Sequence, residues 1–136
     1  MKATRIAHVA IATRSIGVTA ELYKQLGLDL GCIEVVEDQK VKIAVLDCGD
    51  SAIELLEPLS DDSPISRFLE KRGEGLHHIS LEVDNLQQQL DVLKERNVQL
   101  IDDHPRVGAE GRLIAFIHPD STGGVLIELS QTPPDE

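Results

Sequence analysis

Apolar and polar residues alternate along several short segments of the chain, and this period of two predicts β-strands. In residues 5–12 the apolar set is Ala7, Val9 and Ile11. Residues 51–56, 76–83 and 125–130 show the same alternation. Successive side chains of a strand point to opposite faces of a sheet. We therefore expect each of these strands to place one face in a core and the other face away from it.

Apolar residues at helical spacing follow the first predicted strand in each half of the chain. Residues 15–27 predict a helix that ends at Gly27, because glycine readily adopts the backbone conformation that closes a helix. A second helix is predicted after Asn85, whose short polar side chain suits an N-cap. Each half therefore begins with a strand and a helix. The apolar residues of the two helices are Val18, Leu22, Tyr23 and Leu26, and Leu86, Leu90, Leu93 and Val98.

Three extended segments follow each predicted helix, so that both halves of the chain show the pattern βαβββ. A linker helix separates the halves, with Pro64 suited to its first turn and Gly73 to its end. Two copies of a short unit are too few for a solenoid and indicate a pair of related modules. The extended segments are residues 31–36, 41–47 and 52–56 in the first half, and residues 99–102, 113–117 and 125–129 in the second.

The predicted fold class is α+β, with two tandem βαβββ modules that pair pseudo-symmetrically around a metal site. We expect a single domain over residues 1–136, in line with the usual size of one domain. Module 1 covers about residues 4–59, the linker helix about 60–74 and module 2 about 75–131. The polar, proline-containing residues 132–136 are expected to fray.

Four polar residues fall on the face of their strands that is opposite to the apolar set. They are one histidine and one glutamate from each half: His8 and Glu54, and His78 and Glu128. Charged groups are costly to bury without a compensating partner, and a bound cation would provide one. Two imidazole nitrogens and two carboxylate oxygens suit a divalent ion such as cobalt, nickel, manganese or zinc. We predict that these four side chains are metal ligands.

Two neighbours of these residues receive different predictions from the same alternation. Val41, Ile43 and Val45 form the apolar set of their strand, so that Lys42 is expected on the face of the ligands, as a surface or a functional residue. His77 points to the core side if His78 points away from it. We expect His77 to be a buried, neutral, hydrogen-bonded imidazole rather than a ligand.

The composition of the chain disfavours some classes of binding partner and limits how an anionic ligand could be bound. The net charge of -11 and the presence of only three aromatic residues, Tyr23, Phe68 and Phe116, disfavour nucleic-acid binding. No apolar run is long enough to cross a membrane, no targeting segment is apparent, and the two cysteines suggest free, partly buried thiols, so the expected compartment is the cytoplasm. An anionic ligand would need a local basic cluster. The residues available for one are Lys40, Lys42, Arg67, Lys71, Arg72, Arg106 and Arg112.

The order of several short motifs resembles the vicinal oxygen chelate superfamily, which includes glyoxalases, bleomycin resistance proteins and dioxygenases, and within it the methylmalonyl-CoA epimerase family. The resemblance covers nearly the whole chain. The motifs are Ile6-Ala-His-Val-Ala-Ile-Ala12, Ile53-Glu-Leu-Leu-Glu-Pro-Leu59, Asp62-Ser-Pro-Ile65, Gly75-Leu-His-His-Ile79, Pro105-Arg-Val-Gly108, Phe116-Ile-His-Pro119 and Gly123-Gly-Val-Leu-Ile-Glu-Leu129.

The resemblance implies a homodimeric enzyme of propionate metabolism with a divalent metal, typically cobalt, held by His8, Glu54, His78 and Glu128. The implied reaction interconverts (2R)- and (2S)-methylmalonyl-CoA by removal of the α-proton through a metal-stabilised enolate. Glu54 and Glu128 are the expected proton-transfer groups, since Lys42 stands where some relatives carry a second candidate glutamate. The same four ligands also resemble glyoxalase I, a lactoylglutathione lyase. A non-catalytic small-molecule-binding module of the same fold is the third alternative.

Overall fold

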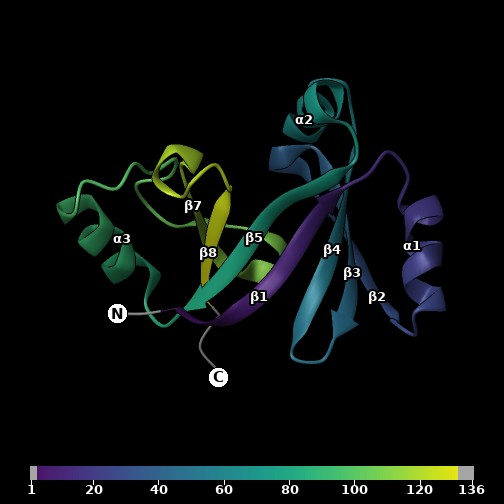
Figure 1. Ribbon diagram of the computed structural model, residues 1–136, viewed down its shortest axis with the longest axis horizontal. Helices are drawn as coiled ribbons and strands as arrows, with labels where there is room; N and C mark the ends of the chain where they lie inside the picture. The colour runs from purple at the N-terminus through teal and green to yellow at the C-terminus, as the bar shows by residue number, and fades with distance from the viewer. Residues whose placement is uncertain (1–2, 132–136) are drawn as a thin grey trace. The chain divides into compact units, whose positions relative to one another are not determined.

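The computed structural model describes residues 3–131, in which three α-helices and eight strands form two compact units (Figure 1). The N-terminal unit is His8–His77, and the C-terminal unit combines Met1–Ala7 with His78–Glu136. The predicted α+β class and the predicted order of strands and helices are confirmed, apart from one strand of the second half. None of the described helices is long and apolar enough to cross a membrane. The predicted tail, residues 132–136, lies outside the described residues.

In the N-terminal unit the strand order is β2-β3-β4-β1. Strand β1 runs parallel to β4, while β3 runs antiparallel to β2 and to β4. Helix α1 covers one face of these strands, and its buried residues Ile16 and Ala20 pack on Ala44, Leu46 and Leu55. The element bounds are β1 Ala3–Ala12, α1 Ile16–Gln25, β2 Leu30–Val36, β3 Val41–Cys48 and β4 Ser51–Pro58, with a 3-10 turn at Glu37–Gln39.

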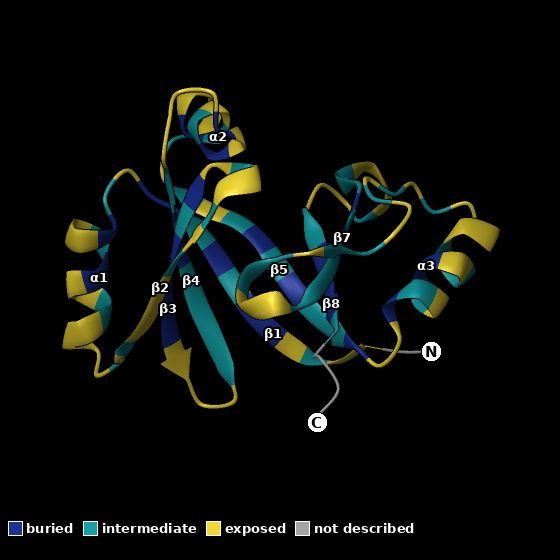
Figure 2. Ribbon diagram, turned by 180° about the vertical axis from the view of Figure 1, so that it is seen from behind, coloured by how far each residue is buried: buried dark blue, intermediate teal, exposed yellow. Residues whose placement is uncertain are grey.

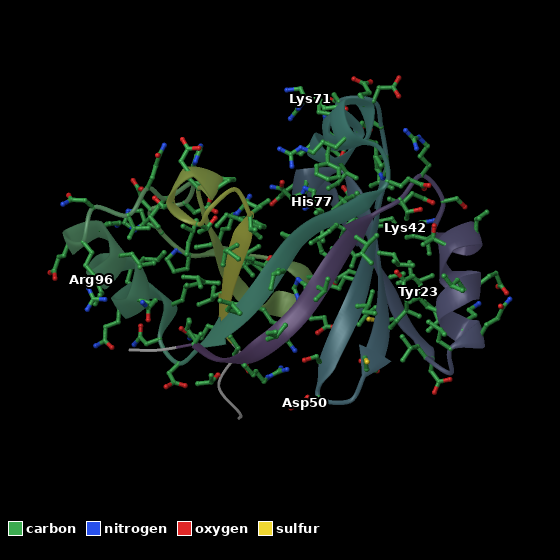
Figure 3. The ribbon with its side chains drawn as sticks, in the orientation of Figure 1. Tyr23, Lys42, Asp50, Lys71, His77 and Arg96 are labelled. Atoms are coloured by element: carbon green, nitrogen blue, oxygen red, sulfur yellow. The ribbon has the colours of Figure 1, made fainter. Side chains whose placement is uncertain are left out.

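The packing face of α1 differs from the one that the sequence suggests. Val18, Leu22 and Leu26 are 75%, 59% and 67% exposed, whereas Ile16 and Ala20 are buried. Tyr23 lies between the helix and the strands (Figure 3). The start of the helix is fixed by Ser15, whose hydroxyl accepts a hydrogen bond from the Val18 amide. The helix has two apolar stripes, and the one that contains Ile16 and Ala20 packs on the strands. Figure 2 shows the exposed outer surface of α1.

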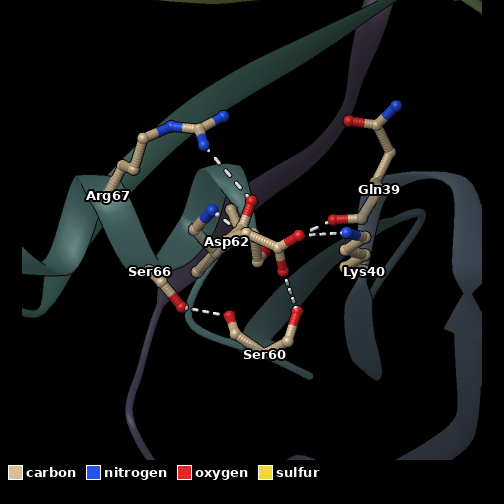
Figure 4. A network of polar contacts seen from close by, with 8 residues as sticks. Gln39, Lys40, Ser60, Asp62, Ser66 and Arg67 are labelled. Carbon is tan, nitrogen blue, oxygen red and sulfur yellow. Dashed lines mark hydrogen bonds and ion pairs between the residues drawn. The ribbon is translucent and has the colours of Figure 1, made fainter.

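Helix α2 (Pro64–Arg72) begins at a turn that is held by polar contacts around Asp62 (Figure 4). The carboxylate of Asp62 accepts a hydrogen bond of 2.5 Å from the Ser60 hydroxyl and forms an ion pair with Lys40. The backbone carbonyl of Asp62 accepts a hydrogen bond of 3.2 Å from Arg67. Ser63 caps the helix by accepting a hydrogen bond from the Ile65 amide. As predicted, Pro64 lies in the first turn and Gly73 follows the last residue.

Stability at low pH provides a test of this turn. The hydrogen bonds from Lys40 and Ser60 lower the pKa of Asp62 from 3.8 to about 2. The folded pKa is below the unfolded one, so the stabilisation is complete above about pH 4 and is lost as the pH falls towards 2. Urea unfolding of the wild-type protein and of Asp62→Asn should therefore differ at pH 6 and converge towards pH 2. A difference that is the same at both pH values would contradict this role of the carboxylate.

In the C-terminal unit the strand order is β1-β5-β8-β7-β6, and β5 pairs parallel with β8. Helix α3 begins after Asn85, whose side chain accepts a hydrogen bond from the Gln88 amide, as its predicted N-cap role requires. The core under α3 contains Val83, Leu86, Leu90, Ala115, Ile117 and Leu129. The element bounds are β5 Gly75–Val83, α3 Leu86–Glu95, β6 Arg106–Val107, β7 Leu113–Ile117 and β8 Ile127–Gln131, with 3-10 turns at Ala109–Gly111 and Pro119–Ser121.

The strand predicted at residues 99–102 is wrong. The structure has only an isolated bridge between Leu100 and Ile117 there, and the strand that pairs with β7 is instead the two-residue β6. The physical reason lies in Asp102. Its carboxylate accepts a hydrogen bond of 2.8 Å from the Phe116 amide, so that a side chain takes the place of a strand carbonyl. This contact ends the backbone ladder along residues 99–102.

Candidate metal centre and active site

In the N-terminal unit, the buried His8 and the largely buried Glu54 form a pair on the strand face away from α1. Glu54 is the register partner of Ala10 on the parallel strand β1, and His8 lies on the same face as Ala10. The Nδ1 atom of His8 is 3.2 Å from Oε2 of Glu54, and their side chains are only 10% and 13% exposed. Ile53 and Leu55, on either side of Glu54, pack under α1. The predicted placement of these two residues is confirmed within this unit.

In the C-terminal unit, His78 and Glu128 form the corresponding pair. The Nε2 atom of His78 is 3.8 Å from Oε1 of Glu128, and the side chains are 6% and 7% exposed. Ile127 and Leu129 pack on the α3 side, so the intervening Glu128 points to the opposite face. Phe116 is the register partner of Glu128, and its ring meets the His78 ring edge-on at 5.3 Å. The aromatic ring therefore fixes the orientation of this imidazole.

The carboxyl group of Glu128 is in an environment that favours proton transfer near neutral pH. Burial raises its pKa from 4.5 to about 7, while a hydrogen bond from Ser80 and the charges of Arg106 and Arg112 act in the opposite direction. A group with a pKa near the working pH can both accept and release a proton. A neighbouring cation would favour the ionised form.

The chemistry of each pair fits a divalent ion. Each unit supplies one imidazole nitrogen and one carboxylate oxygen, held side by side on strands rather than on loops. Both kinds of ligand atom suit divalent metals of the first transition series. His8, His78 and Glu128 are all buried and each offers one ligand atom. A buried carboxylate is costly unless its charge is compensated, and a metal ion provides the compensation.

Lys42 is not on the face of the candidate ligands, contrary to the prediction. Ala44 and Leu46, which share the face of Lys42 along β3, pack under α1. Lys42 is the register partner of Glu57, and its Nζ atom is 3.6 Å from Glu57 Oε2 (Figure 3). The register partner of Glu54 is Val45. Lys42 therefore lies on the opposite face of the strands from Glu54.

His77 is neutral, as the sequence predicts, and it lies against helix α2. Its ring packs edge-on against Phe68 of α2, with the ring centres 4.9 Å apart. Burial lowers the pKa of His77 from 6.5 to about 4, so the imidazole is neutral at pH 7. His77 thus supports the packing of α2 rather than contributing to either His–Glu pair. Cys32 and Cys48 are free thiols, as predicted, but both are exposed rather than partly buried.

Three residues beside the His78–Glu128 pair were not identified from the sequence. Ser80 is the register partner of Glu128 and Phe116 lies on the other side of it. The guanidinium of Arg106 lies over the Phe116 ring at 5.5 Å and is 3.5 Å from the Asp102 carboxylate. Alternation alone places Ser80 on the face of His78, so its position beside the candidate ligands could have been predicted from the sequence. The roles of Phe116 and Arg106 depend on strand pairing, which the sequence does not specify.

Comparison with known proteins gives matches along most of the chain. The sequence model of the Glyoxalase/Bleomycin resistance protein/Dioxygenase superfamily matches residues 7–116. An uncharacterised Bacillus subtilis protein is 47% identical over 133 residues, which are 97% of this chain and 95% of that protein. The ethylmalonyl-CoA/methylmalonyl-CoA epimerase of Cereibacter sphaeroides is 37% identical over 130 residues, which are 93% of this chain and 97% of that enzyme.

Solved structures give the same result. A variant of Streptomyces coelicolor methylmalonyl-CoA epimerase in complex with 2-nitronate-propionyl-CoA superposes with a TM-score of 0.92. The two sequences are 35% identical, and the match covers 99% of each chain. Similarity over the full length, together with a histidine and a glutamate paired in each half, indicates common descent rather than a shared fold alone. The chain therefore belongs to the Glyoxalase/Bleomycin resistance protein/Dioxygenase superfamily and, within it, to the methylmalonyl-CoA epimerase family.

Proposed function

We propose that the chain is a metal-dependent epimerase that interconverts (2R)- and (2S)-methylmalonyl-CoA. The observation that carries this proposal is a buried His–Glu pair in each half of a chain that matches methylmalonyl-CoA epimerases over almost its full length. The glyoxalase I alternative would use the same four side chains. The named epimerases among the relatives favour the first reaction.

The proposed metal ligands are His8, Glu54, His78 and Glu128. They support the proposal because each pair is buried and presents its nitrogen and oxygen on rigid strands. When bound, a divalent ion would act as a Lewis acid that favours negative charge on the substrate oxygens. Cobalt is the ion that the family resemblance suggests. The resemblance also suggests a homodimer that works in the cytoplasm in propionate metabolism, and light scattering by the purified protein tests the dimer.

The proposed reaction removes the proton α to the thioester carbonyl from one face of the substrate and returns a proton to the other. It therefore needs one proton acceptor on each side of the enolate plane. We propose the carboxylates of Glu54 and Glu128, one from each unit, for these roles. The position of Glu128 suits such a role, because its side chain is only 7% exposed and its carboxylate lies beside the His78 imidazole. His8 would then orient the carboxylate of Glu54. Phe116 would orient the imidazole of His78, which lies beside Glu128.

Turnover assays with two substrates test this function. The purified protein, loaded with Co²⁺, should epimerise methylmalonyl-CoA and should not convert the methylglyoxal–glutathione hemithioacetal. Both assays use the same protein preparation, so that a missing activity does not reflect missing metal. Turnover of the hemithioacetal without epimerisation would replace the epimerase proposal with the glyoxalase one. Loss of both activities in metal-loaded protein would favour a binding module.

Binding of coenzyme A is expected to weaken as the salt concentration rises. The protein is acidic overall, with a net charge of -11, so the phosphates must be held by local basic side chains. Exposed ion pairs are screened over about 8 Å at physiological ionic strength. Calorimetric titration with methylmalonyl-CoA at low and at high salt should therefore give a larger Kd at high salt. An unchanged Kd would contradict electrostatic binding of the phosphates.

A further inference from the structure

Two serine hydroxyl groups are fully buried in the C-terminal unit beside the His78–Glu128 pair. Ser80 of β5 is 0% exposed and Ser130 of β8 is 2% exposed. The two Oγ atoms are 3.2 Å apart and form a hydrogen bond. Buried hydroxyl groups are costly without such partners. The two serines therefore satisfy each other's hydrogen-bonding capacity in a buried position.

The register places Ser80 directly beside Glu128. The two residues are partners on the parallel strands β5 and β8, and partners in a ladder share a face of the sheet. His78 lies on the same face, two residues before Ser80. A hydrogen bond from the Ser80 side chain lowers the pKa of the Glu128 carboxyl group, against the larger effect of burial, which raises it. The Ser80 hydroxyl thus bonds to Ser130, and Ser80 lies next to Glu128 on the same face of the strands.

We propose that Ser80 is a positioning residue that holds the Glu128 carboxylate in its metal-binding orientation, and that Ser130 in turn holds Ser80. This inference rests on the proposed function, in which Glu128 is a metal ligand. Groups that hydrogen-bond to a metal ligand fix its orientation, and their loss typically costs about 10–100-fold in metal affinity or activity. A hydroxyl can donate to a carboxylate and accept from a second hydroxyl at the same time. In the structure the Ser80 hydroxyl donates to the Ser130 oxygen. Because hydroxyl protons rotate, Ser130 can instead donate to Ser80, which leaves the Ser80 proton for the Glu128 carboxylate.

Ser63 provides a matched control for a purely structural role. It is also a serine that is 0% exposed, and its hydroxyl accepts a hydrogen bond from the Ile65 amide at the start of α2. Replacement of an N-cap serine by alanine lowers stability. Ser63→Ala therefore removes a buried hydroxyl and destabilises the N-terminal unit, whereas Ser80, Ser130 and Glu128 belong to the C-terminal unit. A general effect of lost stability would appear in this variant as well as in Ser80→Ala.

The experiment is a titration of metal-free protein with Co²⁺, followed by visible absorption, for the wild-type protein, Ser80→Ala, Ser80→Cys and Ser63→Ala. Ser80→Ala should raise the Kd for Co²⁺ by about 10–100-fold. Ser80→Cys keeps a weak donor of similar size and should give a smaller rise. Ser63→Ala should leave the Kd within about twofold of the wild-type value, the range expected for independent sites, because its hydroxyl caps α2. In Co²⁺-saturated Ser80→Ala, kcat should fall while KM stays nearly constant, because Ser80 contacts Glu128 rather than substrate.

Each other outcome overturns the inference in a distinguishable way. Wild-type Co²⁺ affinity and wild-type kcat in Ser80→Ala would show that the hydroxyl does not position Glu128. An equal loss of affinity in Ser63→Ala would assign the effect to stability. If Ser80→Ala fails to fold, Ser80→Cys with wild-type affinity and kcat also refutes the role. Failure of the wild-type protein to bind Co²⁺ would overturn both the proposed metal site and this inference, whereas binding without epimerisation would overturn only the reaction.

Discussion

Replacement of His8 or His78 by alanine is expected to remove most of the bound divalent metal and nearly all of the epimerase activity. The wild-type protein should hold about one ion per chain, the number that one set of four ligands binds. Each substitution removes one of the two nitrogen ligands from a buried position, and with it the imidazole that lies beside Glu54 or Glu128. Elemental analysis of the purified variants after gel filtration measures the metal, and the turnover assay measures the activity.

His77→Ala is the control for this experiment. It removes an imidazole from the residue next to His78, but the His77 ring packs against Phe68 and is neutral because burial lowers its pKa to about 4. The variant should therefore lose stability and keep its metal. An equal loss of metal from His8→Ala, His78→Ala and His77→Ala would show that the assignment of strand faces is wrong.

The faces of the two candidate glutamates could be predicted because the apolar residues on either side of each one along its strand pack towards a helix. In β8, Ile127 and Leu129 pack towards α3 and leave Glu128 on the other face. In β4, Ile53 and Leu55 pack towards α1 and leave Glu54 on the other face. The period-two pattern of the sequence records this difference between the faces. It requires no knowledge of which strands are neighbours.

Lys42 shows where the same method fails. Strand β3 has neighbours on both sides, β2 and β4, and its residues Ile43, Ala44, Val45 and Leu46 are all buried. A strand that is buried on both faces shows no alternation, because apolar residues occupy both sets of positions. The apolar residues Val41, Ile43 and Val45 therefore did not indicate which face of β3 packs under α1. The pairing of Val45 with Glu54 and of Lys42 with Glu57 resolves the ambiguity.

The packing face of helix α1 and the residues around Glu128 were not predicted correctly, for other reasons. The helix carries apolar residues on two sides, and the choice between Val18 and Ile16 depends on how closely the backbone approaches the strands. Arg106 follows a segment in which the Asp102 side chain replaces a strand carbonyl, so its position over Phe116 has no local signal. Local patterns predict elements and faces, whereas side-chain contacts between strands require the register.

Substitution of one proposed proton-transfer glutamate by glutamine is expected to block proton exchange from one epimer much more than from the other. In metal-loaded Glu128→Gln, the epimer whose α-proton faces Glu128 should lose exchange with heavy water by about 10²–10⁴-fold, the usual contribution of a general base. The opposite epimer should still exchange through Glu54. Glu54→Gln should show the reverse preference. Mass spectrometry of each pure epimer, incubated with enzyme in heavy water, measures the exchange.

The asymmetry separates proton transfer from metal binding, since both glutamates are also proposed ligands. Loss of metal would slow exchange from both epimers equally, so each variant is compared only after its metal content has been measured. Glutamine keeps an oxygen that can bind a metal but cannot carry the proton. If both metal-loaded variants epimerise at the wild-type rate, other groups accept the protons. Lys42 would not be among the candidates, because it lies on the α1 face and pairs with Glu57. A water molecule ordered beside the pairs would then be the next proton acceptor to test.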